Sequence, residues 1–138
     1  MNIKIILEAK LKESFYKDGA FEYQKRLFGK VEIIETASIF EYIKNRQNSY
    51  KIAMEIEGKE LTSENFANKI KEIEQEGYYN EILFLIGGAY GLDKKAGDIS
   101  DFKLSLSKMT FLHQETVLIL IEQIYRAYKI LNKEPYHK

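Results

Sequence analysis

Cysteine is absent from this 138-residue sequence, which also has only two histidines and one proline. The lack of cysteine excludes disulfides, thiolate nucleophiles and cysteine-ligated zinc together. Because His113 and His137 are the only imidazoles, a histidine-rich metal site is not expected either, and we predict no metal. The apolar run 116–121 is far shorter than a membrane span, so we expect no membrane partner.

The composition that remains is that of a globular protein, with 45% hydrophobic residues, 30% charged residues and a net charge of zero. A chain of this length can bury a substantial core, so we interpret residues 1–138 as a single domain. The start, "MNIKIILEAK", carries Glu8 in its apolar stretch and lacks a small-residue cleavage site. It indicates a first strand rather than a signal peptide, and therefore a cytoplasmic protein.

Charge is unevenly distributed along the chain. Residues 10–30 carry six Lys/Arg against three Asp/Glu, residues 123–138 carry four against one, and residues 31–100 carry eight against thirteen. The two basic ends could meet a phosphate-bearing partner. An ordinary solvated surface explains the same counts, and charge alone favours that interpretation.

Short runs rich in β-branched residues alternate with helical patterns. Strands are expected at residues 3–9, 30–37, 50–58, 81–88 and 102–107, and helices near 16–27, 62–77 and 113–132. The third strand is expected to close in a turn at Gly58, while residues 36–50 fit either a short helix or a plain connection. The alternation predicts an α/β fold, with a mainly parallel sheet sandwiched by helices.

The last expected helix is apolar on more than one face. Its main stripe at helical spacing consists of Val117, Leu120, Ile121, Ile124, Tyr128 and Leu131. Leu118, Ile119 and Tyr125 add apolar surface outside that stripe. This pattern favours a symmetric homodimer over the alternative, a helix deeply buried in a monomer.

Ligands of open parallel sheets bind at the carboxyl ends of the strands. One such end runs into "GGAYGL", whose glycines permit close backbone approach, although a tight turn alone would explain them. Neither G-x-G-x-x-G nor the P-loop pattern occurs. Another strand end opens into "LSLSKMTFLHQE", a polar, lysine-bearing loop placed before the most hydrophobic helix, which is hard to explain as scaffold alone.

Several segments together resemble the RlmH family of SPOUT methyltransferases. They are "AKLKESFYKDGAFEYQKRL", "IGGAYGL", "LSLSKMTFLHQ", "LIEQIYRAYKI" and the terminal "YHK". The resemblance extends over nearly the whole chain, with the motifs in the right order. It implies a homodimer with a SPOUT-type α/β knot, a trefoil knot in the C-terminal region. It also implies S-adenosylmethionine-dependent methylation of N3 of a pseudouridine in 23S ribosomal RNA (the 1915-type site), within the assembled ribosome or large subunit.

The resemblance also assigns site residues. The cofactor pocket would be formed by Met54, Gly87, Leu106, Ser107, Lys108, Met109, Thr110 and Phe111. Lys108 is poorly suited to a cationic sulfonium, so we assign it to RNA phosphate or to structure. The catalytic candidates are His113, Arg126, Tyr136 and His137.

Each catalytic candidate has an expected role. Histidine titrates near neutral pH, so His137 is the candidate base that accepts the N3 proton. Tyr136 could stack on the target base. Arg126 could hold a phosphate, or could form an interface ion pair. His113 could lie near the active site, or could only cap the start of the last helix.

The sequence departs from the family pattern in three places. Val117 stands where an arginine is usual, Leu112 replaces a proline, and residues 36–50 are shorter than in relatives. Val117 and the shortened segment motivate an alternative, a non-catalytic RNA- or ribosome-binding module that has lost turnover. A third interpretation is a flavodoxin-like or phosphate-binding protein that uses "GGAYG".

Overall fold

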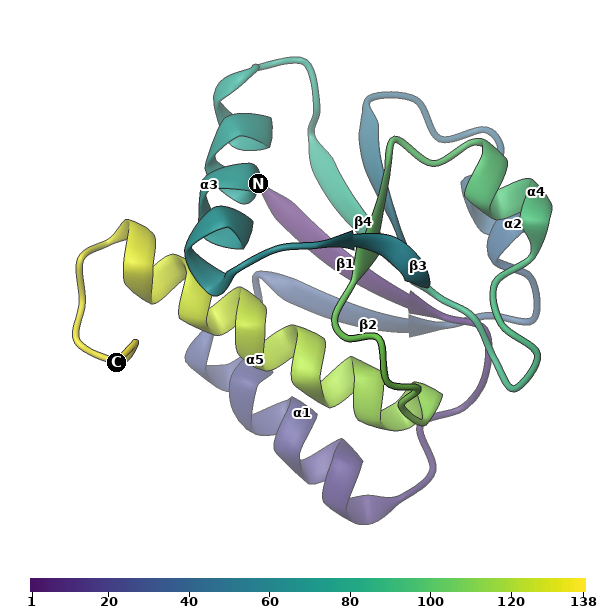
Figure 1. The fold of residues 1–138 in the computed structure, drawn as a ribbon, viewed down its shortest axis with the longest axis horizontal. Helices are drawn as coiled ribbons and strands as arrows, with labels where there is room; N and C mark the ends of the chain where they lie inside the picture. Colours follow the sequence, from purple (N-terminus) through teal and green to yellow (C-terminus); the bar gives the residue numbers. More distant parts are fainter.

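The computed structural model describes residues 1–138, in which strands and helices alternate along the chain (Figure 1). The strands are β1 (Asn2–Leu7), β2 (Val31–Glu35), β3 (Ser49–Glu60), β4 (Glu81–Ile86) and β5 (Phe102–Ser105). The helices are α1 (Ser14–Arg26), α2 (Ile39–Ile43), α3 (Ser63–Gln75), α4 (Lys94–Asp98) and α5 (His113–Leu131). All strand pairs are parallel, in the order β2-β1-β4-β3-β5, so the predicted α/β fold with a parallel sheet is confirmed.

The sheet lies between two layers of helices. Helices α1, α3 and α5 cover one face, and the short α2 and α4 cover the other (Figure 1). Strand β4 is apolar throughout because both of its faces are buried. Ile82, Phe84 and Ile86 enter the larger core, while Leu83 and Leu85 enter the smaller one. None of the helices has the length and apolarity needed to cross a membrane.

Helix α5 is central to the larger core. Its fully buried residues are Val117, Leu120, Ile121, Ile124 and Ala127. The apolar side chains outside this stripe are partly covered by the chain itself, since Leu118 reaches Gly19 of α1 and Tyr125 packs against Tyr23. The chain therefore accounts for much of the apolar surface of α5, and the homodimer stays a prediction.

The strands expected at 3–9, 30–37 and 81–88 each end two residues earlier than expected, and two other boundaries bear on the site. Strand β3 does not turn at Gly58 but continues to Glu60, with a register shift against β5 between Met54 and Lys59. A Cβ atom on Gly58 would lie 2.7 Å from the Lys103 carbonyl carbon, so this glycine permits close approach of two strands at a bulge. Strand β5 ends at Ser105 rather than at residue 107.

The two shortest helices carry little sequence signal. Residues 36–50 contain α2, which settles the open choice between a short helix and a connection in favour of the helix. Ser38 caps it by accepting a hydrogen bond from the Glu41 amide. Helix α4 was not predicted, because its five residues bury only Ala96 and Gly97 and so show no periodicity.

A buried ionic cluster holds the amino ends of the central strands together. Glu81, at the start of β4, is 8% exposed. It forms ion pairs with Lys4 at 3.1 Å and with Arg46 at 2.9 Å, and it accepts a hydrogen bond from the Ser49 hydroxyl. Burial raises the pKa of Glu81, but the hydrogen bonds from Ser49, Lys4 and Arg46 together outweigh it and hold that pKa below its ordinary value.

Candidate functional site

Three of the predicted cofactor residues lie on one edge of the sheet. Met54 of β3 pairs with Leu104 of β5, and the preceding Ala53 pairs with Leu85 of β4. Gly87 directly follows β4, and Leu106 directly follows β5. Gly87 and Leu106 therefore lie at the carboxyl ends of β4 and β5, and Met54 lies between them in the register of β3, level with the end of β4, although β3 itself continues to Glu60. Open parallel sheets bind ligands at this edge.

The glycines after β4 are required by packing. The turn is closed by a hydrogen bond of 3.0 Å from the Gly91 amide to the Gly88 carbonyl. A Cβ atom on Gly87 would lie 2.3 Å from the Gly91 carbonyl carbon and from the Leu92 nitrogen. One on Gly88 would lie 2.5 Å from the Glu8 carbonyl oxygen. The turn is thus pressed against both its own backbone and the end of β1.

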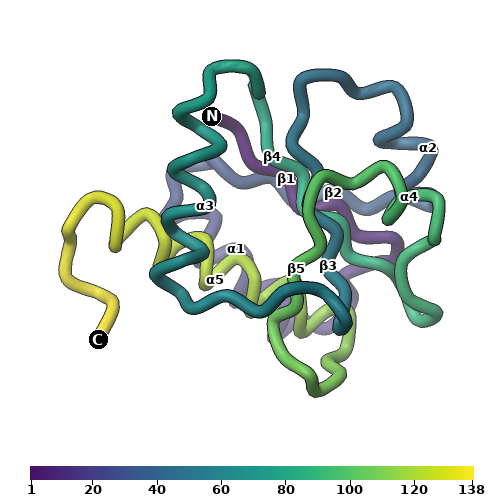
Figure 2. The backbone as a smooth tube through the Cα atoms, turned by 45° about the horizontal axis from the view of Figure 1, so that its top comes forward, coloured from purple at the N-terminus to yellow at the C-terminus, as the bar shows by residue number.

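The loop Leu106–Phe111 is shaped by two serine hydroxyls. Ser105 donates to the Ser107 carbonyl oxygen at 2.9 Å, and the Ser107 hydroxyl accepts from the Met109 amide at 2.9 Å. Figure 2 shows the segment between β5 and α5 extending away from the sheet. Lys108, Met109 and Thr110 are exposed, whereas Leu106, Ser107 and Phe111 are half-buried.

A cavity of about 220 Å³ lies where this loop meets α3 and α5. Its apolar wall is formed by Leu61, Phe66, Leu104, Leu106, Phe111 and Ile119. Its polar lining is formed by Thr62, Ser63, Ser105 and Gln123. Only Leu106 and Phe111 of the predicted cofactor residues line it; Met54 and Gly87 lie on the same sheet edge but outside it. An apolar wall with a few convergent polar groups is typical of a small-molecule site.

A second group of predicted residues gathers at the other end of α5. Glu122 accepts hydrogen bonds from Arg126 Nη2 at 2.9 Å and from the Tyr136 hydroxyl at 2.8 Å. The Tyr136 ring stands edge-on to Tyr125 with centroids 4.8 Å apart, and the Arg126 guanidinium lies 4.8 Å from the centre of the Tyr136 ring. Burial raises the pKa of Tyr136 well above its ordinary value, assisted by hydrogen bonds with Tyr23 and Glu122. Its phenol is therefore protonated at neutral pH.

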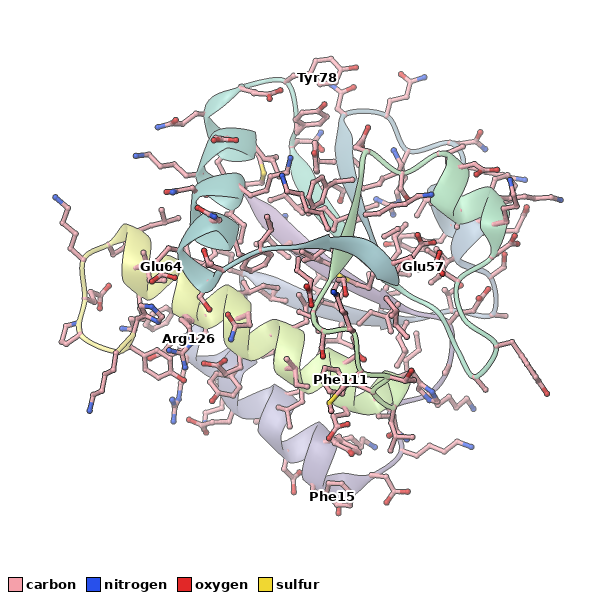
Figure 3. All side chains as sticks on the ribbon, viewed as in Figure 1. Phe15, Glu57, Glu64, Tyr78, Phe111 and Arg126 are labelled. Atoms are coloured by element: carbon pink, nitrogen blue, oxygen red, sulfur yellow. The ribbon has the colours of Figure 1, made fainter.

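His137 bridges α5 and α3. Its Nδ1 lies 3.0 Å from Arg126 Nη1, and its Nε2 lies 3.1 Å from Glu64 Oε2. A guanidinium can only donate, so Nδ1 accepts, and in the neutral ring Nε2 carries the hydrogen that Glu64 receives. Figure 3 shows Glu64 and Arg126 near one another at the carboxyl end of α5. The pKa of Glu64 is lowered by a backbone hydrogen bond and, next, by the hydrogen bond to His137.

His113 does not join this group. It is the first residue of α5 and makes no cap hydrogen bond, since the cap position is Leu112. Thirteen residues separate His113 from Arg126 on one helix, which is about 20 Å at 1.5 Å per residue. Within one chain the four catalytic candidates therefore form two sites, with Arg126, Tyr136 and His137 together and His113 apart.

The sequence interpretation missed two carboxylates that organise the C-terminal group. Glu122 could have been found from its position four residues before Arg126, the spacing of a helical ion pair. Glu64 carries no such signal, because it lies 73 residues from His137 in the chain. Only the packing of α3 against α5 brings it to the tail.

The structure explains Val117, one of the departures from the family pattern. Val117 is fully buried in the larger core. Position 117 in this chain is thus a packing position and faces no RNA or partner. Leu112 is 66% exposed at the N-cap position of α5 and makes no cap hydrogen bond.

Comparisons with known proteins agree on one family. The family described as "Predicted SPOUT methyltransferase" matches residues 1–137. The ribosomal RNA large subunit methyltransferase H of Clostridioides difficile is 41% identical over 160 residues, and that of Halothermothrix orenii is 40% identical over 160 residues. Both alignments cover 100% of this chain and 100% of the relative.

The alignments are 22 positions longer than this chain, which has 138 residues against 160 aligned positions. This difference supports the expectation that the chain is shortened relative to the family.

Solved structures share the fold at low identity. TrmJ from Z. mobilis matches with a TM-score of 0.58 and 12% identity, covering 100% of this chain and 73% of that one. The SpoU methyltransferase AviRb from Streptomyces viridochromogenes, in complex with the cofactor AdoMet, matches with a TM-score of 0.53 and 8% identity. That match covers 91% of this chain and 57% of AviRb.

Proposed function

This chain belongs to the SPOUT methyltransferase family and, within it, to the RlmH proteins, and we propose that it methylates N3 of a pseudouridine in 23S ribosomal RNA with S-adenosylmethionine. The observation that carries the proposal is full-length identity of about 40% to ribosomal RNA large subunit methyltransferases H, with no part of either chain left out. The assembled ribosome or large subunit in the cytoplasm, and the trefoil knot of the C-terminal region, belong to the same proposal.

The residues at the carboxyl edge of the sheet fit the cofactor. Met54, Gly87 and the loop Leu106–Phe111 would hold it; of these, Leu106 and Phe111 line the cavity, where they would offer apolar walls for the adenine faces. When bound, S-adenosylmethionine supplies a methyl group on a positively charged sulfur. The cavity of about 220 Å³ is below the roughly 300 Å³ at which drug-sized ligand sites begin. We infer that the exposed part of the loop moves when the cofactor enters.

The C-terminal group would receive the base. N3 of pseudouridine carries a hydrogen, so a lone pair becomes available for attack only when that proton leaves. His137 is the proposed acceptor, but both ring nitrogens are engaged, Nδ1 by Arg126 and Nε2 by Glu64. We infer that RNA binding draws Arg126 towards a phosphate and so frees Nδ1. Tyr136, protonated and edge-on to Tyr125, would stack on the base or donate to it.

The separation of His113 from the tail favours a homodimer. If two copies pack their α5 helices in opposite directions, the amino end of one helix approaches the carboxyl end of the other. His113 and the cofactor loop of one subunit would then meet Arg126, Tyr136 and His137 of its partner. The exposed Phe15, Met109 and Leu112, at 62%, 75% and 66%, supply apolar surface near the amino end of α5.

The non-catalytic alternative loses one of its two motives. Val117 is a core residue, so its difference from the family arginine does not by itself remove a substrate contact. The shortened segment remains as a motive, and its expected effect is on docking to the ribosome rather than on the cofactor residues at the carboxyl edge of the sheet.

Three measurements on the purified protein test the proposal. Calorimetric titration should show micromolar binding of S-adenosylmethionine, and sedimentation should show a dimer. Labelled methyl groups should then pass to ribosomes from a strain that lacks its own enzyme. Tight cofactor binding without transfer to any ribosomal particle would favour the binding module instead.

A further inference from the structure

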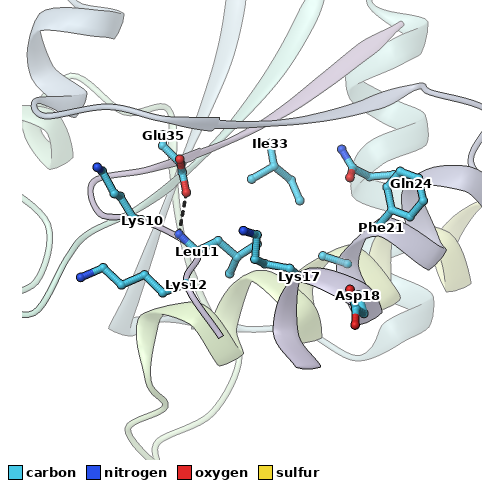
Figure 4. Close-up of a pocket in the computed structure, with 10 residues that line it drawn as sticks. Lys10, Leu11, Lys12, Lys17, Asp18, Phe21, Gln24, Ile33 and Glu35 are labelled. Atoms are coloured by element: carbon cyan, nitrogen blue, oxygen red, sulfur yellow. Dashed lines mark hydrogen bonds between the residues drawn. The ribbon is translucent and has the colours of Figure 1, made fainter. Parts of the chain in front are cut away.

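A basic trough, separate from the cavity beside the cofactor loop, lies between α1 and the edge strand β2. Its volume is about 750 Å³. Its lining consists of Lys10, Leu11, Lys12, Lys17, Asp18, Ala20, Phe21, Gln24, Ile33 and Glu35. Figure 4 shows Lys10 and Lys12 at one end, Phe21 and Gln24 at the other, and Lys17 between them. The proposed reaction assigns none of these residues a role.

The lysines of the trough have no acidic partner within the chain. The ion pairs in this part of the molecule are made by Lys25, Arg26 and Lys30 instead. Of the two acids in the lining, Glu35 accepts a hydrogen bond from the Leu11 amide at 2.6 Å and Asp18 forms no ion pair, so three lysines against two acids leave the lining with a net charge of +1. Lys10, Lys12 and Lys17 are exposed and are therefore available to an anion.

The far wall adds a surface on which a base can stack. Phe21 is 61% exposed and has Lys25 above its ring at 5.8 Å. Gln24 is held beside it by donating to the Val31 carbonyl oxygen at 3.3 Å. Cations combined with an open aromatic face are the features that bind single-stranded nucleic acid, through phosphates and through stacking.

The trough is connected to the cofactor edge through the segment that follows β1. Gly88, in the turn after β4, approaches the Glu8 carbonyl oxygen so closely that a Cβ atom would lie 2.5 Å from it. Further along, the amides of Lys12 and Glu13 both donate to Gln114 Oε1, at 2.6 and 3.0 Å. Residues 8–13 are thus fixed between the glycine turn and the residue after His113. An RNA strand in the trough would therefore lie beside a segment that also contacts the cofactor edge.

We propose that this trough, formed by Lys10, Lys12, Lys17 and Phe21, binds a single-stranded segment of ribosomal RNA that flanks the methylated nucleotide. This inference rests on the proposed function and adds a docking surface to it. The lysines neutralise phosphates, and Phe21 stacks on one base. The surface holds the substrate but takes no part in methyl transfer.

The first test removes two cations from the trough. In the Lys10→Gln/Lys17→Gln variant, the KM for undermodified ribosomes should rise about tenfold with kcat nearly unchanged. The slope of log affinity against log salt should fall by about 1.4, since each lost single-strand phosphate contact contributes about 0.7. Lys71→Gln/Lys94→Gln is the matched control, because it removes two exposed cations from α3 and α4, outside both the trough and the C-terminal group.

The second test uses two phenylalanines of one region. Phe21→Ala should weaken ribosome binding about tenfold, because base stacking is lost. Phe28→Ala should leave binding unchanged, although Phe28 is even more exposed, at 95%, because it does not line the trough. Calorimetric titration with S-adenosylmethionine should give wild-type affinity for both variants.

The outcomes separate this inference from the proposed function. If the wild type methylates ribosomal RNA and the trough variants match their controls in KM and salt slope, the docking surface is wrong and the function stands. If the wild type binds the cofactor but transfers no methyl group to ribosomes, the proposed function fails, and the docking surface fails with it.

Discussion

The glycine turn after β4 offers a sharp test of the cofactor edge. In the Gly87→Ala variant the new Cβ atom would lie 2.3 Å from two backbone atoms, Gly91 C and Leu92 N. Ordinary contact needs at least 3.4 Å, so the turn has to open by about 1 Å, and such overpacking costs about 1–3 kcal/mol of stability. A displacement of about 1 Å at a binding edge can cost about 100-fold. We therefore expect the affinity for S-adenosylmethionine to fall 10- to 100-fold.

A second glycine supplies the control. Gly77 ends α3 with a φ of +74° and has nothing within 4 Å of its Cβ position. Gly77→Ala therefore introduces backbone strain of about 1–2 kcal/mol without displacing any neighbour. Denaturant unfolding should show both variants destabilised, while calorimetric titration should show weakened cofactor binding only for Gly87→Ala. If Gly87→Ala binds the cofactor as tightly as Gly77→Ala does, the turn is no part of the pocket.

Three further substitutions have defined outcomes. Glu81→Gln should lower the free energy of unfolding by about 2 kcal/mol, since it breaks a mostly buried ionic cluster. Because the pKa of Glu81 is lowered in the folded state, its stabilising contribution is present above the unfolded pKa and is lost on acidification through the folded pKa. The stability of the variant should therefore depend less on pH below about 5 than that of the wild type. Tyr136→Phe should lower kcat about tenfold, which corresponds to the loss of one good hydrogen bond. The loss should be equal from pH 6 to 9, because the raised pKa keeps the phenol protonated, and a loss that grew with pH would refute this. Leu120→Ala, at a fully buried site, should cost about 2–5 kcal/mol in chemical denaturation; a loss below 1 kcal/mol would contradict the packing of α5.

Much of the fold follows from periodicity in the sequence. The apolar run of β4 predicted a central strand because both of its faces enter a core. Thr62 is of a residue type favoured at the start of a helix, and its hydroxyl caps α3 by accepting a hydrogen bond from the Asn65 amide at 3.0 Å. The error at Gly58 arose because a glycine in a strand signals either a turn or a close approach. Only the position of β5 decides between the two.

The site was predictable where its parts lie at strand ends. The order of the strands placed Gly87 and Leu106 at strand ends, and the family resemblance assigned them to one cofactor pocket. The pairing of His137 with Glu64 was not predictable, because it depends on how α3 packs against α5. The trough was not predictable either, since Lys10 and Phe21 line one surface only when α1 folds beside β2.

The measurement that tests the central claim most directly is identification of the methylated nucleoside. Purified protein and S-adenosylmethionine are incubated with ribosomes that lack the modification, and the 23S ribosomal RNA is digested and analysed by mass spectrometry. The account predicts close to one N3-methylpseudouridine for each particle, and none with the Gly87→Ala variant at limiting cofactor. Ribosomal RNA without added methyl groups, or with a methyl group on a ribose or on another base, would contradict it.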